Sequence, residues 1–231
     1  MDFHLNMSHP RLPYADRVEA GRILAVAARP YRDRDDLLIL GLPRGGVPVA
    51  YEMARLLKAP MDVLIVRKLG VPGQPELAMG AIATGGVRVL HQAVVSGAGV
   101  SKAAIEATVR AEQRELERSN RVYRGERPPP NLASRCVFLV DDGVATGLTM
   151  RAAVNAAKQQ QPASVIVAVP VASREAIDGL QPLVDAVICP AIPDWFVSVG
   201  QWYSHYEQIT DDEVRALLGQ AWQSQTMRKA E

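Results

Sequence analysis

The tract from Cys136 to Gln160 carries the strongest structural signal in this chain. Residues 136–140 are all apolar and rich in β-branched side chains, which is typical of a strand buried on both faces. Two aspartates and a turn of small residues come next, and residues 150–160 have the composition of a helix. A helix that begins after such a turn points its first backbone N–H groups, and the positive end of its dipole, at one place. The tract therefore predicts an α/β unit with an anion-binding turn.

Similar apolar runs recur along the chain and alternate with helical tracts. They lie at residues 37–42, 61–66, 164–171 and 186–189, and further helices are predicted at 14–28, 49–57, 101–123, 174–180 and from Asp211 onward. Strands that alternate with helices form parallel sheets with right-handed crossovers. We therefore expect an α/β fold, with a five-stranded parallel sheet flanked by helices. At 231 residues, 48% of them hydrophobic, the whole chain (1–231) is expected to form a single domain.

Residues 70–125 interrupt this alternation. The Gly- and Pro-rich start of the interval is expected to be a loop, and short strands are expected at 77–84 and 87–90, around the Gly85-Gly86 turn. The long helix that follows is capped by Ser101, is highly charged and has a thin apolar face. We expect this insertion to be the least stable part of the fold.

Composition excludes several classes of function. The net charge of +1 gives no electrostatic basis for binding nucleic acid or a membrane surface. No apolar run reaches the roughly 18 residues that a membrane span needs, and the four histidines show no metal-ligand spacing. Cys136 and Cys189 are expected to be reduced core residues. Together with an N-terminus (residues 1–13) that lacks the features of a signal peptide, they indicate a cytoplasmic protein.

The polar residues after the central strand suggest what the turn binds. Carboxylates beside an anion site, here Asp141 and Asp142, suit a ligand that also carries hydroxyl groups or a bound Mg²⁺. A phosphorylated sugar offers both. Thr146 and Thr149 can add hydroxyl donors, and the glycines allow close approach of the backbone. The alternative is that the aspartates only cap the turn.

The ten residues from Val140 to Thr149, VDDGVATGLT, resemble the signature with which type I phosphoribosyltransferases bind 5-phosphoribosyl-1-diphosphate (PRPP). The resemblance covers about residues 14–215. It implies that Asp141 and Asp142 bind the ribose hydroxyls and that the following turn wraps the 5′-phosphate. The residues of that turn are Gly143, Val144, Ala145, Thr146, Gly147, Leu148 and Thr149. Some family members have a carboxylate where this chain has alanine, as the adenine phosphoribosyltransferases also do, so one candidate general base is missing here.

Two further segments match the family's diphosphate site. Arg44, Gly45 and Gly46 lie in the turn after the first core strand, where the family binds pyrophosphate and often has a non-proline cis peptide. Arg67 and Lys68 are expected at the carboxyl end of the next strand, where open α/β sheets place ligands and where the family keeps basic residues. The alternatives are that the first segment is only a tight turn with a surface arginine and that the second is only a pair of surface charges. The resemblance implies Mg²⁺ as an ion carried by PRPP, and no protein metal ligand is assigned.

The resemblance also assigns a flexible lid to residues 70–125 and a small hood to residues 190–231, although a plain two-stranded appendage would explain the first equally well. Aromatic residues gather in the hood. Its segment Trp195, Phe196 and Val197 resembles the tract that stacks on the purine in hypoxanthine–guanine phosphoribosyltransferases. However, its spacing to the next glycine is one residue longer, and a serine stands where an acidic residue is expected. A base-binding platform and a packing patch both remain open.

The sequence thus predicts an enzyme that transfers the 5-phosphoribosyl group from PRPP to a nitrogen nucleophile, for which a purine-type base is one candidate, and releases pyrophosphate. Asp141, Asp142, Arg67 and Lys68 are the expected catalytic residues, and Asp142→Asn is expected to lower turnover with little effect on folding. The expected partners are PRPP and an unidentified acceptor, and a homodimer is allowed for. The alternatives are a catalytically silent sensor of PRPP or a nucleotide and, third, a hydrolase.

Overall fold

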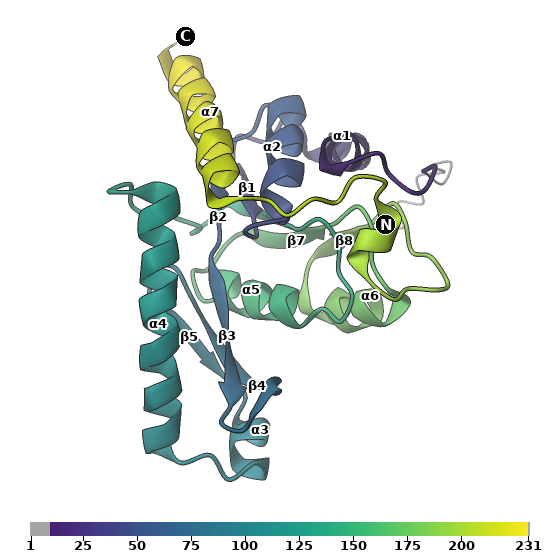
Figure 1. Cartoon of the computed structure of the whole chain (residues 1–231). Helices are drawn as coiled ribbons and strands as arrows, with labels where there is room; N and C mark the ends of the chain where they lie inside the picture. The colour runs from purple at the N-terminus through teal and green to yellow at the C-terminus, as the bar shows by residue number, and fades with distance from the viewer. Residues whose placement is uncertain (1–9, 231) are drawn as a thin grey trace.

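The central sheet contains five parallel strands in the order β2-β1-β6-β7-β8. They are β1 (Leu37–Gly41), β2 (Met61–Val63), β6 (Cys136–Val140), β7 (Ser164–Ala168) and β8 (Ala186–Ile188) (Figure 1). This computed structural model describes residues 10–230, so the expectation about residues 1–13 lies mostly outside the described part of the chain. The predicted α/β fold with a five-stranded parallel sheet is confirmed.

Helices cover both faces of this sheet (Figure 1). The helices of the main layers are α1 (Arg17–Ala27), α2 (Gly46–Leu57), α5 (Leu148–Lys158), α6 (Arg174–Leu180) and α7 (Asp211–Ala230), with short 3-10 turns η1 (Arg29–Tyr31), η2 (Gln181–Leu183) and η3 (Val199–Trp202). Side chains of β6 alternate between the two faces, as strand geometry requires. Phe138 packs in the core beneath α1 and α2, whereas Val137 and Leu139 pack against α5 and α6.

A second, antiparallel sheet is built from β3 (Val66–Val71), β4 (Gln74–Ala83) and β5 (Val87–Leu90). The predicted hairpin at Gly85-Gly86 is confirmed, and both glycines have positive φ angles, of 91° and 77°. The prediction of a loop at the start of residues 70–125 is wrong, because β3 and β4 fill most of that stretch and only a short turn at Gly73 separates them.

The strand predicted at 61–66 is split in two. The parallel strand β2 ends at Val63, and β3 begins at Val66 and pairs with β4 instead. A single apolar run cannot show such a change of partner sheet, because both halves are equally hydrophobic. The consequence is that Arg67 and Lys68 lie within an antiparallel strand, and the expectation that they close a parallel strand is wrong.

The insertion is completed by α3 (Gln92–Gly97) and the long helix α4 (Lys102–Arg124), whose predicted cap, Ser101, accepts a hydrogen bond from the Ala104 backbone N–H. The last residue of α4 fastens this insertion to the central sheet. The buried Arg124 guanidinium donates to the Asp62 carboxylate at 2.9 Å and also to the Val63 carbonyl oxygen. The base of the insertion is therefore fixed to β2.

Helix α7 packs against α2, α4 and β2, so it bridges the central layers and the insertion (Figure 1). Its expected cap, Thr210, accepts a hydrogen bond from the Glu213 backbone N–H at 3.2 Å, and the Glu213 carboxylate accepts from the Thr210 backbone N–H at 2.7 Å. This reciprocal pair is a capping box. Within residues 10–230, no helix has the length and apolar character that crossing a membrane would require.

Candidate active site

The turns after β1 and β6 lie against each other, and glycine makes this approach possible. A Cβ atom at Gly45 would overlap the Asp142 carboxylate, and one at Gly46 would overlap the Val140 carbonyl oxygen. The peptide bond between Pro43 and Arg44 is cis, as the family resemblance led us to expect in this turn. The structure therefore brings together the two turns that the sequence singled out.

Asp142 is held in a buried network. The Arg17 Nε atom donates to Asp142 Oδ2 at 2.8 Å, both side chains are 9% exposed, and the Tyr203 hydroxyl donates to the Asp142 carbonyl oxygen. Arg17 also donates to the Glu207 carbonyl oxygen at 2.9 Å and lies 4.0 Å from the ring centroid of Tyr206. Asp142 thus joins α1 and the hood to the sheet, and the expectation that its replacement has little effect on folding is not supported.

Asp141 has different surroundings. Its Oδ1 atom accepts a hydrogen bond from the Asp142 backbone N–H at 2.9 Å, and its Cα atom lies directly beside Gly46. Burial and, second, the negative charge of Asp142 raise the pKa of the Asp141 carboxyl well above its usual range. Of the two aspartates, Asp142 is the one in a close ion pair with an arginine, whereas Asp141 accepts a hydrogen bond from the backbone.

The turn from Gly143 to Thr149 leads into α5 as predicted. Gly147 precedes the helix with φ 76°, a left-handed conformation that favours glycine. The Val144 backbone N–H donates to the Val171 carbonyl oxygen at 3.0 Å, which fixes the start of the turn on the neighbouring strand. Thr146 and Thr149 are exposed, so the hydroxyls and the helix N-terminus are accessible to an anion.

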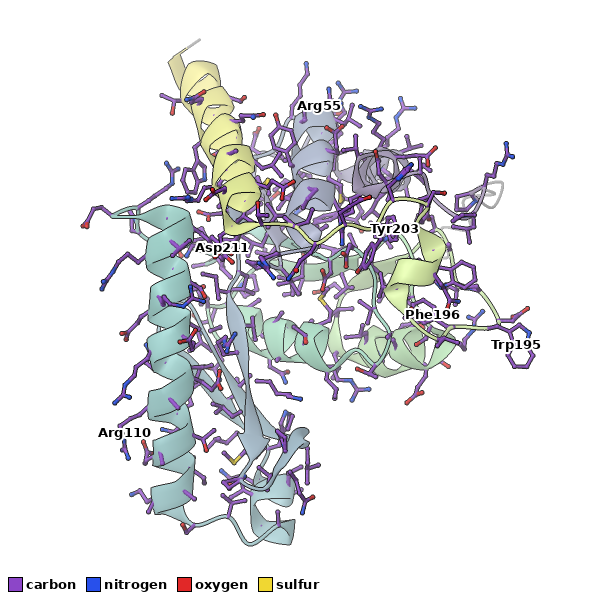
Figure 2. The ribbon with its side chains drawn as sticks, viewed as in Figure 1. Arg55, Arg110, Trp195, Phe196, Tyr203 and Asp211 are labelled. Atoms are coloured by element: carbon purple, nitrogen blue, oxygen red, sulfur yellow. The ribbon has the colours of Figure 1, made fainter. Side chains whose placement is uncertain are left out.

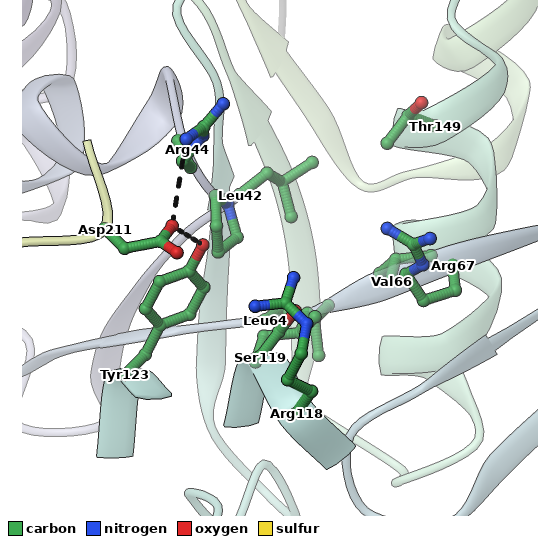
Figure 3. A pocket seen from close by; sticks show the side chains of 12 residues that line it. Leu42, Arg44, Leu64, Val66, Arg67, Arg118, Ser119, Tyr123, Thr149 and Asp211 are labelled. Carbon is green, nitrogen blue, oxygen red and sulfur yellow. Dashed lines mark hydrogen bonds and ion pairs between the residues drawn. The ribbon is translucent and has the colours of Figure 1, made fainter. Parts of the chain in front are cut away.

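A cavity of about 320 Å³ lies beside these turns (Figure 3). Its polar lining includes Arg44 from the turn after β1, Arg67 from β3 and Thr149 from α5. Three segments distant in the sequence, each with a predicted role, therefore meet at one hollow. Lys68 is the next residue along β3 and is not among the lining residues.

The other polar walls of the cavity come from residues that the sequence did not single out. Helix α4 supplies Arg118, Ser119 and Tyr123, and the first residue of α7 supplies Asp211. The Tyr123 hydroxyl donates to Asp211 Oδ1 at 2.8 Å, and Arg44 Nη1 lies 3.8 Å from the same oxygen (Figure 3). Nothing in the charged pattern of α4 separates these residues from its other polar positions, so the sequence alone could not find them.

The electrostatic character of the cavity is positive. Three guanidinium groups line it against one carboxylate, and burial followed by the hydrogen bond to Asp211 raises the pKa of Tyr123 to about 12, so its hydroxyl keeps its proton at neutral pH. Guanidinium groups bind phosphate oxygens through several donors in a planar fork. The cavity is therefore suited to a phosphate or diphosphate group.

The proposed base-binding segment lies elsewhere. Trp195 and Val197 are each 86% exposed, and Phe196 packs on Trp202 with ring centroids 6.1 Å apart. None of the three lines the cavity. Figure 2 shows Trp195 at the outer edge of the hood, at the opposite side of the view from Asp211. Base binding by this segment therefore stays a prediction.

The family implies a Mg²⁺ ion, and the donor set can be compared with that requirement. Within residues 10–230, no group of three or more His, Cys, Asp or Glu side chains is arranged to hold a metal. Mg²⁺ is commonly bound through one or two carboxylates together with the phosphate oxygens of a substrate. With one carboxylate in its wall, the cavity fits an ion held mainly by a ligand's own diphosphate oxygens.

Comparisons with known proteins agree with this geometry. A family model described as a phosphoribosyl transferase domain matches residues 19–207. A Mycobacterium tuberculosis protein named "Putative phosphoribosyl transferase Rv0571c" is 45% identical over 208 residues, which are 90% of this chain and 47% of that protein. This chain therefore spans about half the length of the curated relatives it matches.

A solved structure, that of TT1426 from Thermus thermophilus, is 40% identical, with a TM-score of 0.82 over 90% of this chain and 98% of that one. The solved fold therefore extends over almost all of the described residues, the insertion included. Since the family model covers residues 19–207, which include both turns and every residue of the cavity lining except Asp211, the chain belongs to the phosphoribosyltransferase family.

Proposed function

We propose that this protein transfers the 5-phosphoribosyl group of PRPP to a nitrogen nucleophile and releases pyrophosphate. The observation that carries the proposal is the cavity that joins Thr149, at the end of the phosphate turn, to Arg44 and Arg67. PRPP bears a 5′-phosphate and a 1-diphosphate on one ribose ring, so it needs two anion sites separated by a sugar site. The turn and the arginine-lined cavity supply the two anion sites.

The proposed reaction breaks the bond between C1 of the ribose and the diphosphate oxygen and forms a bond from C1 to the acceptor nitrogen, which loses a proton to solvent. The transition state resembles an oxocarbenium ion, as in glycosyl transfer generally. Arg44 and Arg67 would stabilise the negative charge that develops on the departing diphosphate. Residues 143–149 would hold the 5′-phosphate, and Asp141 would hold the ribose hydroxyls.

Mg²⁺ bound to the diphosphate would neutralise part of the leaving-group charge. The remaining contribution of the protein is positioning, because holding both phosphates fixes C1 relative to the acceptor. This scheme needs no nucleophilic side chain, and it is compatible with alanine at position 145, where some family members have a carboxylate.

A second candidate function, binding of PRPP without turnover, is favoured by one observation. The Asp142 carboxylate is engaged by Arg17 in a buried ion pair, and a carboxylate so engaged is not available to a sugar hydroxyl. A protein that keeps the anion sites but lacks this contact would bind PRPP and act as a sensor.

One experiment separates these functions. The purified protein is incubated with PRPP, Mg²⁺ and a panel of nitrogen acceptors, and PRPP and nucleotides are quantified by ion-exchange chromatography. A new nucleotide supports the transferase, and loss of PRPP without acceptor indicates a hydrolase. Binding of PRPP without loss supports the sensor, and absence of both binding and turnover contradicts the whole assignment.

A further inference from the structure

The cavity arginines are already partly neutralised by carboxylates of the protein itself. Arg44 lies 3.8 Å from Asp211, Arg67 lies 2.8 Å from Glu112, and Arg118 lies 3.0 Å from Glu115. All three carboxylates come from α4 and α7, whereas Arg44 and Arg67 belong to the two sheets and their turns. Each arginine that lines the cavity is therefore paired with a carboxylate from one of these two helices.

Asp211 is the carboxylate among these that itself lines the cavity. It opens α7, where the helix dipole favours a negative charge, and the Tyr123 hydroxyl of α4 donates to it at 2.8 Å (Figure 3). Because the pKa of Tyr123 is raised to about 12 by burial, this donor is present throughout the neutral range. Two helices thus hold the carboxylate in front of Arg44.

The ion pair between Asp211 and Arg44 is weak enough for a ligand's phosphate oxygen to replace the carboxylate. At 3.8 Å it is an ion pair without a close hydrogen bond, and each side chain is 38% exposed. Ion pairs with this exposure contribute little to stability, so a phosphate oxygen can replace the carboxylate at the guanidinium without loss of fold. Until it is displaced, Asp211 both occupies Arg44 and repels a second anion.

We propose that Asp211 is an internal substitute for the diphosphate group, which occupies Arg44 in the free protein and thereby sets the affinity of the cavity for its anionic ligand. This inference rests on the proposed function, since it takes the diphosphate of PRPP, and pyrophosphate as product, to be the ligands of the cavity. Binding then exchanges a carboxylate of α7 for a phosphate oxygen.

The neighbouring residue provides a matched control. Asp212 has the same side chain one position further along the same helix, but it is 82% exposed and pairs with Arg215 on the helix surface. Asp211→Asn and Asp212→Asn therefore remove the same charge from α7 at nearly the same place. Only the first removes it from the cavity.

The test is calorimetric titration with inorganic pyrophosphate, without metal and with Mg²⁺. We expect Asp211→Asn to bind pyrophosphate about fivefold or more tightly than the wild type in both conditions, and Asp212→Asn to stay within about twofold of it. Asp211→Ser, a second neutral variant, is expected to tighten binding in the same way, and thermal melting of each variant checks the fold.

Unchanged or weaker binding by both neutral variants, with wild-type binding intact, would overturn this inference alone. Weaker binding by Asp211→Asn in the presence of Mg²⁺ only would make Asp211 a metal ligand and would also overturn it. If neither the wild type nor the variants bind pyrophosphate in either condition, the proposed diphosphate site itself fails.

Tyr123→Phe tests the coupling to α4. Loss of the hydroxyl frees Asp211 from its tether, so we expect a smaller tightening than with Asp211→Asn, and no further change when Tyr123→Phe is added to Asp211→Asn. Equal additional tightening in the double variant would show that Tyr123 acts on the anion directly, which would contradict the tether.

Discussion

The two neighbouring aspartates after β6 differ in what balances their charge. The Asp142 carboxylate is buried against Arg17 at 2.8 Å, whereas Asp141 is next to that same negative charge and has a raised pKa. Identical residues at adjacent positions therefore have different surroundings: Asp142 connects the hood and α1 to the sheet, and Asp141 is the one that we propose contacts a ligand. The sequence could show the pair but not this division, because Arg17 lies 125 positions away.

The ion pair between Arg17 and Asp142 predicts a large effect on stability. Arg17→Met leaves a buried carboxylate without its partner, and we expect the free energy of unfolding to fall by about 3 kcal/mol. Denaturant unfolding, followed by circular dichroism, measures this free energy of unfolding. Arg22→Met, whose side chain is 59% exposed on the same helix, serves as the control. A loss below about 1 kcal/mol for Arg17→Met would contradict a stabilising role for the pair.

Replacing Asp141 is expected to raise the stability of the fold, whereas replacing Arg17 lowers it. Because the pKa of Asp141 is raised well above its usual range, ionisation is less favourable in the folded protein than in the unfolded chain, and it costs stability at neutral pH. We expect Asp141→Asn to raise the melting temperature at pH 7 by a few degrees. The gain should shrink as the pH falls through the raised pKa toward 4, where the wild-type carboxyl is protonated. A gain that is independent of pH would contradict this explanation.

At the scale of elements, the split of the predicted strand 61–66 shows where sequence patterns reach their limit. The apolar runs predicted all five parallel strands, although the edge strand β8 is only half-buried, and the strand–turn–helix pattern predicted the turns after β1 and β6. The pattern could not show that the chain leaves the central sheet at Val63 and enters another at Val66. It therefore misplaced Arg67 and Lys68, although Arg67 still reaches the cavity.

The lining of the cavity predicts unequal roles for these two cations. Arg67 lines the cavity and Lys68 is not among its lining residues, so Arg67→Gln is expected to weaken pyrophosphate binding about tenfold, as loss of one charge-assisted hydrogen bond would. Lys68→Gln is expected to change the affinity by less than about threefold. Calorimetric titration of both variants measures the affinity for pyrophosphate. A larger effect of Lys68→Gln than of Arg67→Gln would make the lysine the principal cation and would contradict this prediction.

At the scale of the whole molecule, the cavity is an assembly of distant parts. Its walls come from the turn after β1 (residues 42–44), the connection from β2 into β3 (64–67), α4, α5 and α7. Sequence analysis found the walls that follow strands, because strand ends carry recognisable turns. It missed the walls that come from helices, because one charged residue among many on a helix surface has no distinguishing pattern.

This assembly predicts a distributed response to ligand. Binding of pyrophosphate to the cavity is expected to slow amide hydrogen exchange in residues 42–46 and 118–123 together, since a ligand held by both segments reduces their local opening. Helix α6, none of whose residues lines the cavity, is expected to stay unchanged. Hydrogen exchange with mass spectrometry measures this, and protection confined to residues 143–149 would place pyrophosphate in the phosphate turn instead.

The position of Asp211 in the cavity wall also has a consequence for biosynthesis. The chain leaves the ribosome N-terminus first, and the two sheets with their turns are complete before α7 has been translated. Until residue 211 emerges, Arg44 lacks the α7 carboxylate, while Arg67 can already pair with Glu112 of α4. A translation intermediate arrested before that residue would therefore expose Arg44 to cellular polyphosphates, and the completed helix would bring Asp211 to it.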